Sequence, residues 1–246
     1  MKEVLFYIVI LLSNIIQGIT GFAGTILAMP FSLHLVGMET AVPVLNMLGL
    51  LSGIYVFVLN YKSVDKKVLW HVCFVMGPAL LAGIFIKSLL SGKPGLLYII
   101  LGVVVLGVAI SGFIKEVRHK ANGKKGPMGN SVVLNLVLVA AGIVHGMFVC
   151  GGPLLISYMT RKLPEKSAFR ATISTVWIFL NGMLFVSHIL QGAWTMSVLR
   201  QGAVSVPFLL GGMFIGGRLY SKMSQEFFVR LTYVLLFIAG LSLFFK

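Results

Sequence analysis

The chain has 246 residues, of which 58% are hydrophobic and 11% are charged, and its mean hydropathy is +1.01. Soluble domains average about 45–50% apolar and about 25% charged residues, so this composition excludes a soluble protein and indicates an integral membrane protein. The formal net charge of +14 lies mainly in short loops between apolar segments. That placement is typical of the positive-inside rule, so we expect a lipid bilayer around the chain and no nucleic-acid partner.

The first half, residues 1–115, is predicted to be one transmembrane repeat. It opens with a long apolar block at 4–37, which the glycine-containing stretch 21–24 divides. About 20 residues suffice for one span, so this block is longer than a single crossing needs. Plain apolar segments follow at 42–59, 68–90 and 96–114.

The most polar part of the chain, residues 116–130, is predicted to be a basic cytoplasmic linker. The second repeat, residues 131–246, follows the same plan with a long block at 131–159, a basic connector at 161–170, and plain segments at 171–190, 198–219 and toward the C-terminus. When 18–24 is matched with 146–152, Gln17 aligns with His145. A polar side chain therefore precedes a glycine cluster in both halves.

The distribution of positive charge favours one topology. If all eight segments crossed the membrane, the 20 lysines and arginines would be divided almost evenly between the two sides. If the blocks at 4–37 and 131–159 are re-entrant hairpins, most of these charges lie on one side, as the positive-inside rule requires. A hairpin plus three spans is an odd number of crossings, so the two repeats would be inverted, with both termini outside.

We therefore predict an all-α polytopic membrane protein of two inverted repeats, each with one broken or re-entrant block and three transmembrane helices. Charge alone also permits an arrangement in which only the block at 131–159 is re-entrant. A conventional chain of eight spans is the remaining alternative. We expect the protein in the cell membrane, which would be the inner membrane of a prokaryote.

The glycine clusters lie at what should be mid-membrane depth. Irregular backbone is tolerated there only where protein or a polar cavity surrounds it, and paired interruptions in two halves are typical of transport sites. Half-helices that begin near Thr25 and Pro153 would point their positive ends, with close N–H groups, toward a bound anion. The alternative is that the glycines only permit close packing of helices.

The acidic residues also favour an anion. All six lie at or outside predicted segment ends; they are Glu3, Glu39, Asp65, Glu116, Glu165 and Glu226. Transporters of cations or protons usually place a carboxylate inside the membrane. The two cysteines, Cys73 and Cys150, form neither a zinc-site pattern nor a disulfide framework. We predict no catalytic residues, cofactor or metal, and a membrane enzyme or assembly subunit is the least favoured class.

Gln17 and His145 are the strongest side-chain candidates, because either can donate a hydrogen bond to an oxyanion and His145 can also carry a proton. The predicted substrate-binding residues are Asn14, Gln17, Thr20, Gly21, Gly24, Thr25, Asn46, His145, Gly146, Cys150, Gly151, Gly152, Arg170 and Asn181. The alternatives are polar bridges between helices, an inert buried cysteine, and a surface charge at Arg170 that sets topology.

The stretches 18–24 with Pro30, 146–153, 168–172 and 211–220 occur in this order along the chain. On these residues the chain resembles the TauE/SafE family, also called the 4-toluene sulfonate uptake permease family. The resemblance covers nearly the whole chain, although the family often has glycine at the positions of Ala23 and Val149.

The resemblance implies a transporter of small anions such as sulfite, thiosulfate or sulfonates. We therefore predict a secondary carrier for sulfite, a sulfonate or another organosulfur anion, bound at the midplane between the two glycine-rich breaks. An anion channel with a backbone-lined filter is the alternative. The sequence also permits a homodimer.

Overall fold

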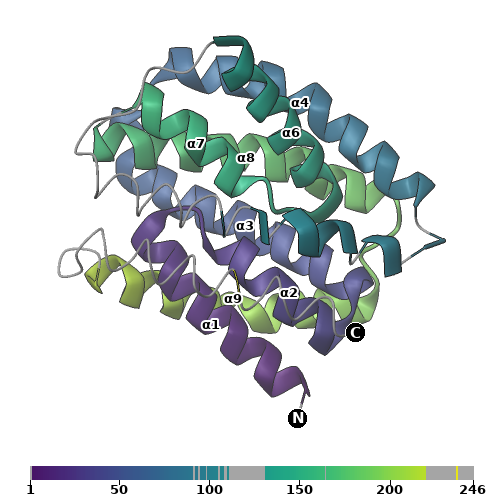
Figure 1. Ribbon diagram of the computed structural model, residues 1–246. Coiled ribbons are helices and arrows are strands. Elements are labelled where there is room, and N and C mark those ends of the chain that lie inside the picture. The colour runs from purple at the N-terminus through teal and green to yellow at the C-terminus, as the bar shows by residue number, and fades with distance from the viewer. Residues whose placement is uncertain are drawn as a thin grey trace.

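The computed structural model describes residues 2–90, 92–93, 95–97, 99–104, 106–107, 110, 131–163, 165–219 and 237. The elements of these residues are helices (Figure 1). They are α1 (Lys2–Thr20), α2 (Gly24–Val36), α3 (Met38–Asn60), the short 3-10 helix η1 (Tyr61–Ser63), α4 (Lys66–Leu89), α6 (Ser131–Phe148), α7 (Gly152–Lys162), α8 (Lys166–Leu190) and α9 (Met196–Leu219). Of the described helices, α1, α3, α4, α6, α8 and α9 are long and apolar enough to cross a membrane.

The helices confirm the predicted all-α class and the division of both long blocks. The first block breaks at 21–23 between α1 and α2, and the second breaks at 149–151 between α6 and α7. The basic connector predicted at 161–170 is wrong in extent, because α7 continues to Lys162 and α8 begins at Lys166. Lysine and arginine are good helix formers, so a basic stretch need not be a loop.

Part of the predicted plan cannot be compared with the fold. The linker at 116–130 and most of the last predicted segment lie outside the described residues, and the segment at 96–114 lies only partly inside them.

Two helix pairs form the flanks of the bundle, α1 with α9 and α4 with α6. Glycines bring these backbones together. A Cβ added to Gly18 would lie 2.8 Å from the carbonyl oxygen of Met213 on α9, and one added to Gly142 would lie 2.7 Å from that of Met76 on α4. Close helix packing by small residues is common in membranes, and here it accounts for several of the glycines.

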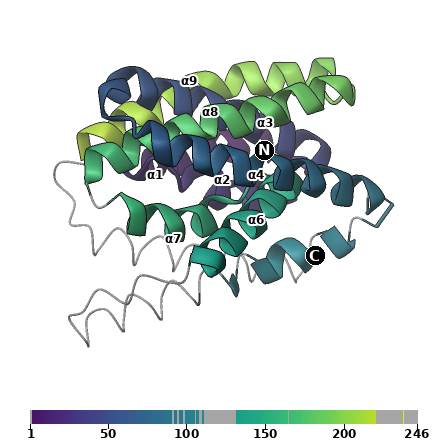
Figure 2. The same ribbon diagram turned by 90° about the horizontal axis from the view of Figure 1, so that it is seen from above.

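The helices α3 and α8 pack against each other between these flanks (Figure 1). They run antiparallel. The N–H of Asp65, just after α3, donates to Thr172 Oγ1 near the start of α8 (2.9 Å), whereas Asn46 in α3 bonds to Asn181 far along α8. The helices run side by side in the second view as well (Figure 2).

The neighbours of each helix in the first half recur in the second. The contacts α1–α2, α2–α3 and α3–α9 have counterparts in α6–α7, α7–α8 and α8–α4. The outer faces carry large exposed apolar side chains such as Leu12, Phe74, Phe85, Leu136 and Leu190. Such a surface suits a lipid environment rather than water, so the fold is that of a multi-pass membrane protein.

Candidate functional site

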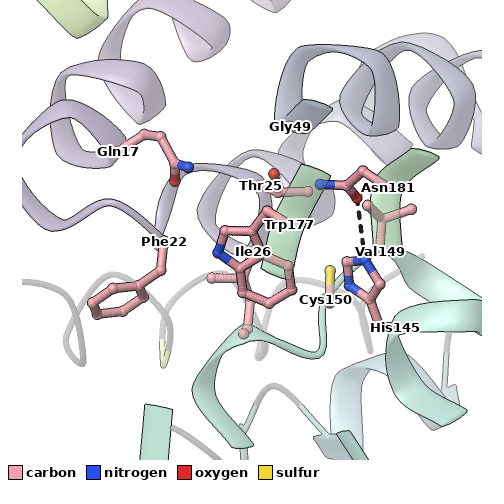
Figure 3. Close-up of a pocket in the computed structure, with 11 residues that line it drawn as sticks. Gln17, Phe22, Thr25, Ile26, Gly49, His145, Val149, Cys150, Trp177 and Asn181 are labelled. Atoms are coloured by element: carbon pink, nitrogen blue, oxygen red, sulfur yellow. Dashed lines mark hydrogen bonds between the residues drawn. The ribbon is translucent and has the colours of Figure 1, made fainter. Parts of the chain in front are cut away.

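The two helix breaks meet beside the α3–α8 pair and line a small cavity (Figure 3). Its lining comes from both halves of the chain: Gln17, Phe22, Thr25, Ile26, Gly49, His145, Val149, Cys150, Gly152, Trp177 and Asn181. The cavity volume is about 20 Å³. A cavity needs about 10–15 Å³ to admit a water molecule, so this one has room for about one water, and an oxyanion would require its walls to move apart.

Thr20 builds the turn of the first break. Its hydroxyl accepts hydrogen bonds from the N–H groups of Phe22 (3.3 Å) and Ala23 (3.2 Å), and donates to the Ile16 carbonyl (2.7 Å). Gly21 follows with φ +81°, a backbone conformation that glycine adopts without steric cost. Both residues hold the break in shape and lie outside the lining of the cavity.

Gln17 connects the break to the start of α2. Its Oε1 accepts the N–H of Gly24 (2.7 Å) and its Nε2 donates to Ser52 Oγ on α3 (3.2 Å). The N–H groups in the first turn of a helix have no acceptor within that helix, and Thr25 and Ile26 of this turn line the cavity. The positive end of α2 is therefore at the cavity wall.

The second break has the same backbone hydrogen bond and positive φ as the first, but at a valine instead of a glycine. The N–H of Val149 donates to the His145 carbonyl (2.8 Å), as that of Gly21 donates to the Gln17 carbonyl (2.6 Å). Val149 has φ +59°, which is costly for a β-branched side chain and occurs mainly where function or surrounding structure imposes it. Its side chain lines the cavity, and α7 begins immediately after the break.

A chain of buried hydrogen bonds joins α6, α8 and α3 at the cavity. His145 Nε2 lies 3.1 Å from Asn181 Oδ1, and the N–H of Gly151 donates to His145 Nδ1 at 3.4 Å. Because Nδ1 accepts, Nε2 carries the hydrogen, and the imidazole is neutral. Asn46 Nδ2 donates to both the backbone oxygen and Oδ1 of Asn181, each at 3.1 Å.

The amide nitrogen of Asn181 faces the cavity. A Cβ added to Gly49 would lie 3.0 Å from Asn181 Nδ2 and 3.5 Å from Thr25 Oγ1, so the glycine leaves space in front of this donor. The Asn181 oxygen already accepts from two side chains, which orients the carboxamide with its N–H groups toward the open side.

Trp177 supplies the most informative atom of the site. Its side chain is only 5% exposed and lines the cavity, yet its Nε1 has no hydrogen-bond partner among the described residues. Its ring packs on His145 with centroids 5.1 Å apart. Buried donors are nearly always satisfied, and an exception requires an explanation. A ligand acceptor in the cavity would supply one.

The structure brings Gln17, Thr25, His145, Cys150, Gly152 and Asn181 together from the predicted set. The other predicted residues lie around this group rather than on the cavity wall. Asn14 donates to the Ile10 carbonyl (2.8 Å) and packs against Gly212 of α9. Arg170 Nη2 donates to the Gly18 carbonyl near the C-terminus of α1 (3.0 Å), where a cation stabilises the helix end.

Five lining residues were absent from the predicted set: Phe22, Ile26, Gly49, Val149 and Trp177. Of these five, only Trp177 could have been recognised from the sequence. Tryptophan in membrane proteins is enriched at the two interfaces, whereas Trp177 lies well inside an apolar segment. It also precedes Asn181 by four positions, which places both on one face of a helix.

Asn181→Ala is expected to lower the stability of the protein by about 1–3 kcal/mol, because His145 and Asn46 would each lose a buried partner. The matched control is Asn60→Ala, which removes a side chain that donates to the Val56 carbonyl within its own helix. Thermal unfolding in detergent measures the stability of both variants. Equal melting temperatures for the two variants would contradict a structural role for the buried chain.

A family model described as "Sulfite exporter TauE/SafE" matches residues 6–243, nearly the whole chain. Searches of curated proteins and of solved structures found no match. The family is one of membrane transporters, which agrees with the apolar spans and with the resemblance carried by the glycine stretches. The chain belongs to the sulfite exporter TauE/SafE family.

Proposed function

We propose that the protein is a secondary carrier for a small anion, with sulfite, a sulfonate or another organosulfur anion as substrate. The anion would bind in the cavity between the two breaks. The observation that carries this proposal is the buried N–H of Trp177, a donor without a partner among the described residues at the cavity wall. An oxyanion supplies the acceptor that this group lacks.

The electrostatics of the lining support the same proposal. None of the described side chains that line the cavity is acidic. The first turns of α2 and α7 meet there, and helix N-termini favour anions through their N–H groups and their dipoles. The Asn181 amide adds a further donor. A cation would find few acceptors here, because the oxygens of Gln17 and Asn181 already accept hydrogen bonds from the protein.

Trp177→Phe tests the site directly, because it removes one N–H and keeps an aromatic ring. A hydrogen bond to a charged group contributes about 1.5–3 kcal/mol, so anion affinity should fall by roughly 10- to 100-fold. The empty protein should lose only the packing of the missing ring atoms, since the N–H has no hydrogen-bond partner among the described residues. The measurement is the thermal shift of purified protein with sulfite, thiosulfate, sulfoacetate or taurine.

Trp194→Phe is the matched control. Trp194 also has a buried Nε1 without a partner among the described residues, but it lies outside the cavity lining. Its replacement should leave the anion-induced shift unchanged. If no anion in the panel raises the melting temperature, or if both variants behave alike, the assignment of the cavity is wrong.

The narrowness of the cavity, about 20 Å³, supports a carrier over a channel. A conducting pore keeps a continuous path, whereas a carrier encloses its substrate and exposes it to one side at a time. Counterflow of labelled anion in liposomes, without a steady conductance, is the expected result. A persistent anion current without counterflow would favour the channel.

We also infer that the two repeats are inverted in the cell membrane, with both termini outside and the linker at 116–130 in the cytoplasm. The antiparallel packing of α3 and α8, which hold the same place in the two halves, supports this. Cysteines introduced at the exposed residues Glu39 and Lys162 should react with an impermeant maleimide from opposite sides, Glu39→Cys from outside. Labelling of both from one side would overturn the arrangement.

A further inference from the structure

The described lining of the cavity holds no positively charged side chain to accompany a bound anion. Among the described lining residues, none is lysine or arginine, and the guanidinium of Arg170 is engaged with the Gly18 carbonyl outside the lining. Burying an ion without a partner is strongly unfavourable, and helix dipoles offset only part of that cost. The lining therefore needs another source of positive charge when the anion is bound.

His145 is the lining side chain that can become a cation. We propose that His145 takes up one proton with each anion, so that the carrier moves an anion and a proton together. This inference rests on the proposed anion transport through the same cavity. It names the coupling ion, and it requires no change in the covalent bonds of either the protein or the anion.

The hydrogen bonds of His145 suit this role (Figure 3). Its Nε2–H donates to Asn181 and would continue to do so in the protonated ring. Its Nδ1 accepts only the long bond from the Gly151 N–H, at 3.4 Å. A proton on Nδ1 converts this acceptor into a donor and releases the Gly151 N–H at the start of α7. Protonation thus adds a positive charge and frees a backbone donor next to the cavity.

The described residues in contact with His145 carry no competing charge. Its described partners, Asn181, Gly151 and Trp177, are all neutral. The titratable or charged groups on the elements packed around it are His71, Cys73, Lys66, Lys67 and Lys87 of α4, Cys150 of the break, Tyr158, Arg161 and Lys162 of α7, and Lys166, Arg170 and His188 of α8. Of those whose side chains the structure describes, only the thiol of Cys150 lines the cavity.

The proton follows a simple cycle. When the cavity opens to one side, Nδ1 takes up a hydrogen ion from the aqueous solution there and forms an N–H bond. When the cavity opens to the other side, this bond breaks and the hydrogen ion is released into the solution on that side. No electrons are transferred. One positive charge accompanies one monoanion, so the transport step moves no net charge and responds to a pH gradient rather than to membrane potential.

The test uses the full chain in liposomes with labelled methanesulfonate, which is fully ionised near neutral pH. With the membrane potential held at zero by potassium and valinomycin, an outside solution one pH unit more acidic should drive about tenfold accumulation, because one pH unit is a tenfold ratio of protons. A pH dye inside the liposomes should record one proton entering per anion. Counterflow at equal pH is measured first on the same preparation.

The outcomes separate the two proposals. Counterflow without pH-driven accumulation overturns proton coupling and leaves the anion carrier standing, whereas the absence of counterflow overturns both. His145→Gln keeps a donor for Asn181 and an acceptor for Gly151 but holds no proton, so accumulation should fall from tenfold to equilibration. The matched control His71→Gln lies outside the cavity and should retain the tenfold ratio. Retention of that ratio by His145→Gln would overturn the assignment to His145.

Discussion

Replacing Gly152 by leucine is expected to abolish the anion-induced thermal shift and transport while the protein remains folded. Gly152 lies at the cavity wall, where α7 begins. A Cβ at this position would be 3.5 Å from the Phe22 carbonyl oxygen and 3.7 Å from Trp177 Cζ2. The remaining carbons of leucine would therefore enter a cavity of about 20 Å³, little more than the roughly 10–15 Å³ that a single water molecule needs.

Gly152→Ala is the control that distinguishes volume from backbone freedom. The added methyl group meets only ordinary van der Waals distances, so anion binding should persist with modest weakening. Melting curves with and without sulfite, together with counterflow in liposomes, measure both variants. If Gly152→Leu still binds and transports the anion at the normal rate, the substrate does not occupy this cavity.

Replacing Gly146 by alanine is expected to destabilise the fold. A Cβ there would overlap the Leu80 carbonyl oxygen and lie 3.0 Å from the Ile84 backbone nitrogen on α4. Because these are backbone atoms, the two helices must separate. Overpacking of this kind costs about 1–3 kcal/mol, and sometimes more. Thermal unfolding in detergent should show a clearly lower melting temperature.

Gly182→Ala provides the comparison on α8. A Cβ at Gly182 would meet no atom within 4 Å, and alanine favours a helix over glycine by about 0.5–1 kcal/mol. Its melting temperature should stay the same or rise. If the alanine variants at 146 and 182 melt alike, the α4–α6 contact does not depend on the glycine.

The two halves contribute to the cavity in matching register. The alignment that pairs Gln17 with His145 also pairs Phe22 with Cys150 and Gly49 with Trp177, and all six line the cavity. The backbone positions are thus alike, but the side chains differ. Gly49 leaves space at the position where its counterpart carries the indole of Trp177. The site therefore combines backbone positions that repeat in the two halves with hydrogen-bond donors that come mainly from the second half.

The sequence by itself determined the membrane class, the all-α fold, the two interrupted blocks and the absence of acidic residues inside the predicted segments. These features follow from local properties. Apolar runs of sufficient length become helices because lipid offers their backbone no hydrogen-bond partners. Glycines that follow a polar side chain at matching places in the two halves marked the interruptions, whereas the glycine pairs at 211–212 and 216–217 lie within the continuous helix α9. The breaks at 21–23 and 149–151 were therefore readable without any knowledge of packing.

Only the tertiary structure decided which way each residue faces. Gly146 and Gly152 belong to one predicted cluster, yet the first contacts α4 and the second lines the cavity. Arg170 meets the Gly18 carbonyl, and Trp177 reaches the cavity from α8. Each of these contacts joins residues far apart in the chain. The rotation and pairing of helices depend on the shapes of both partners, so the division between packing residues and site residues appears only once the bundle is assembled.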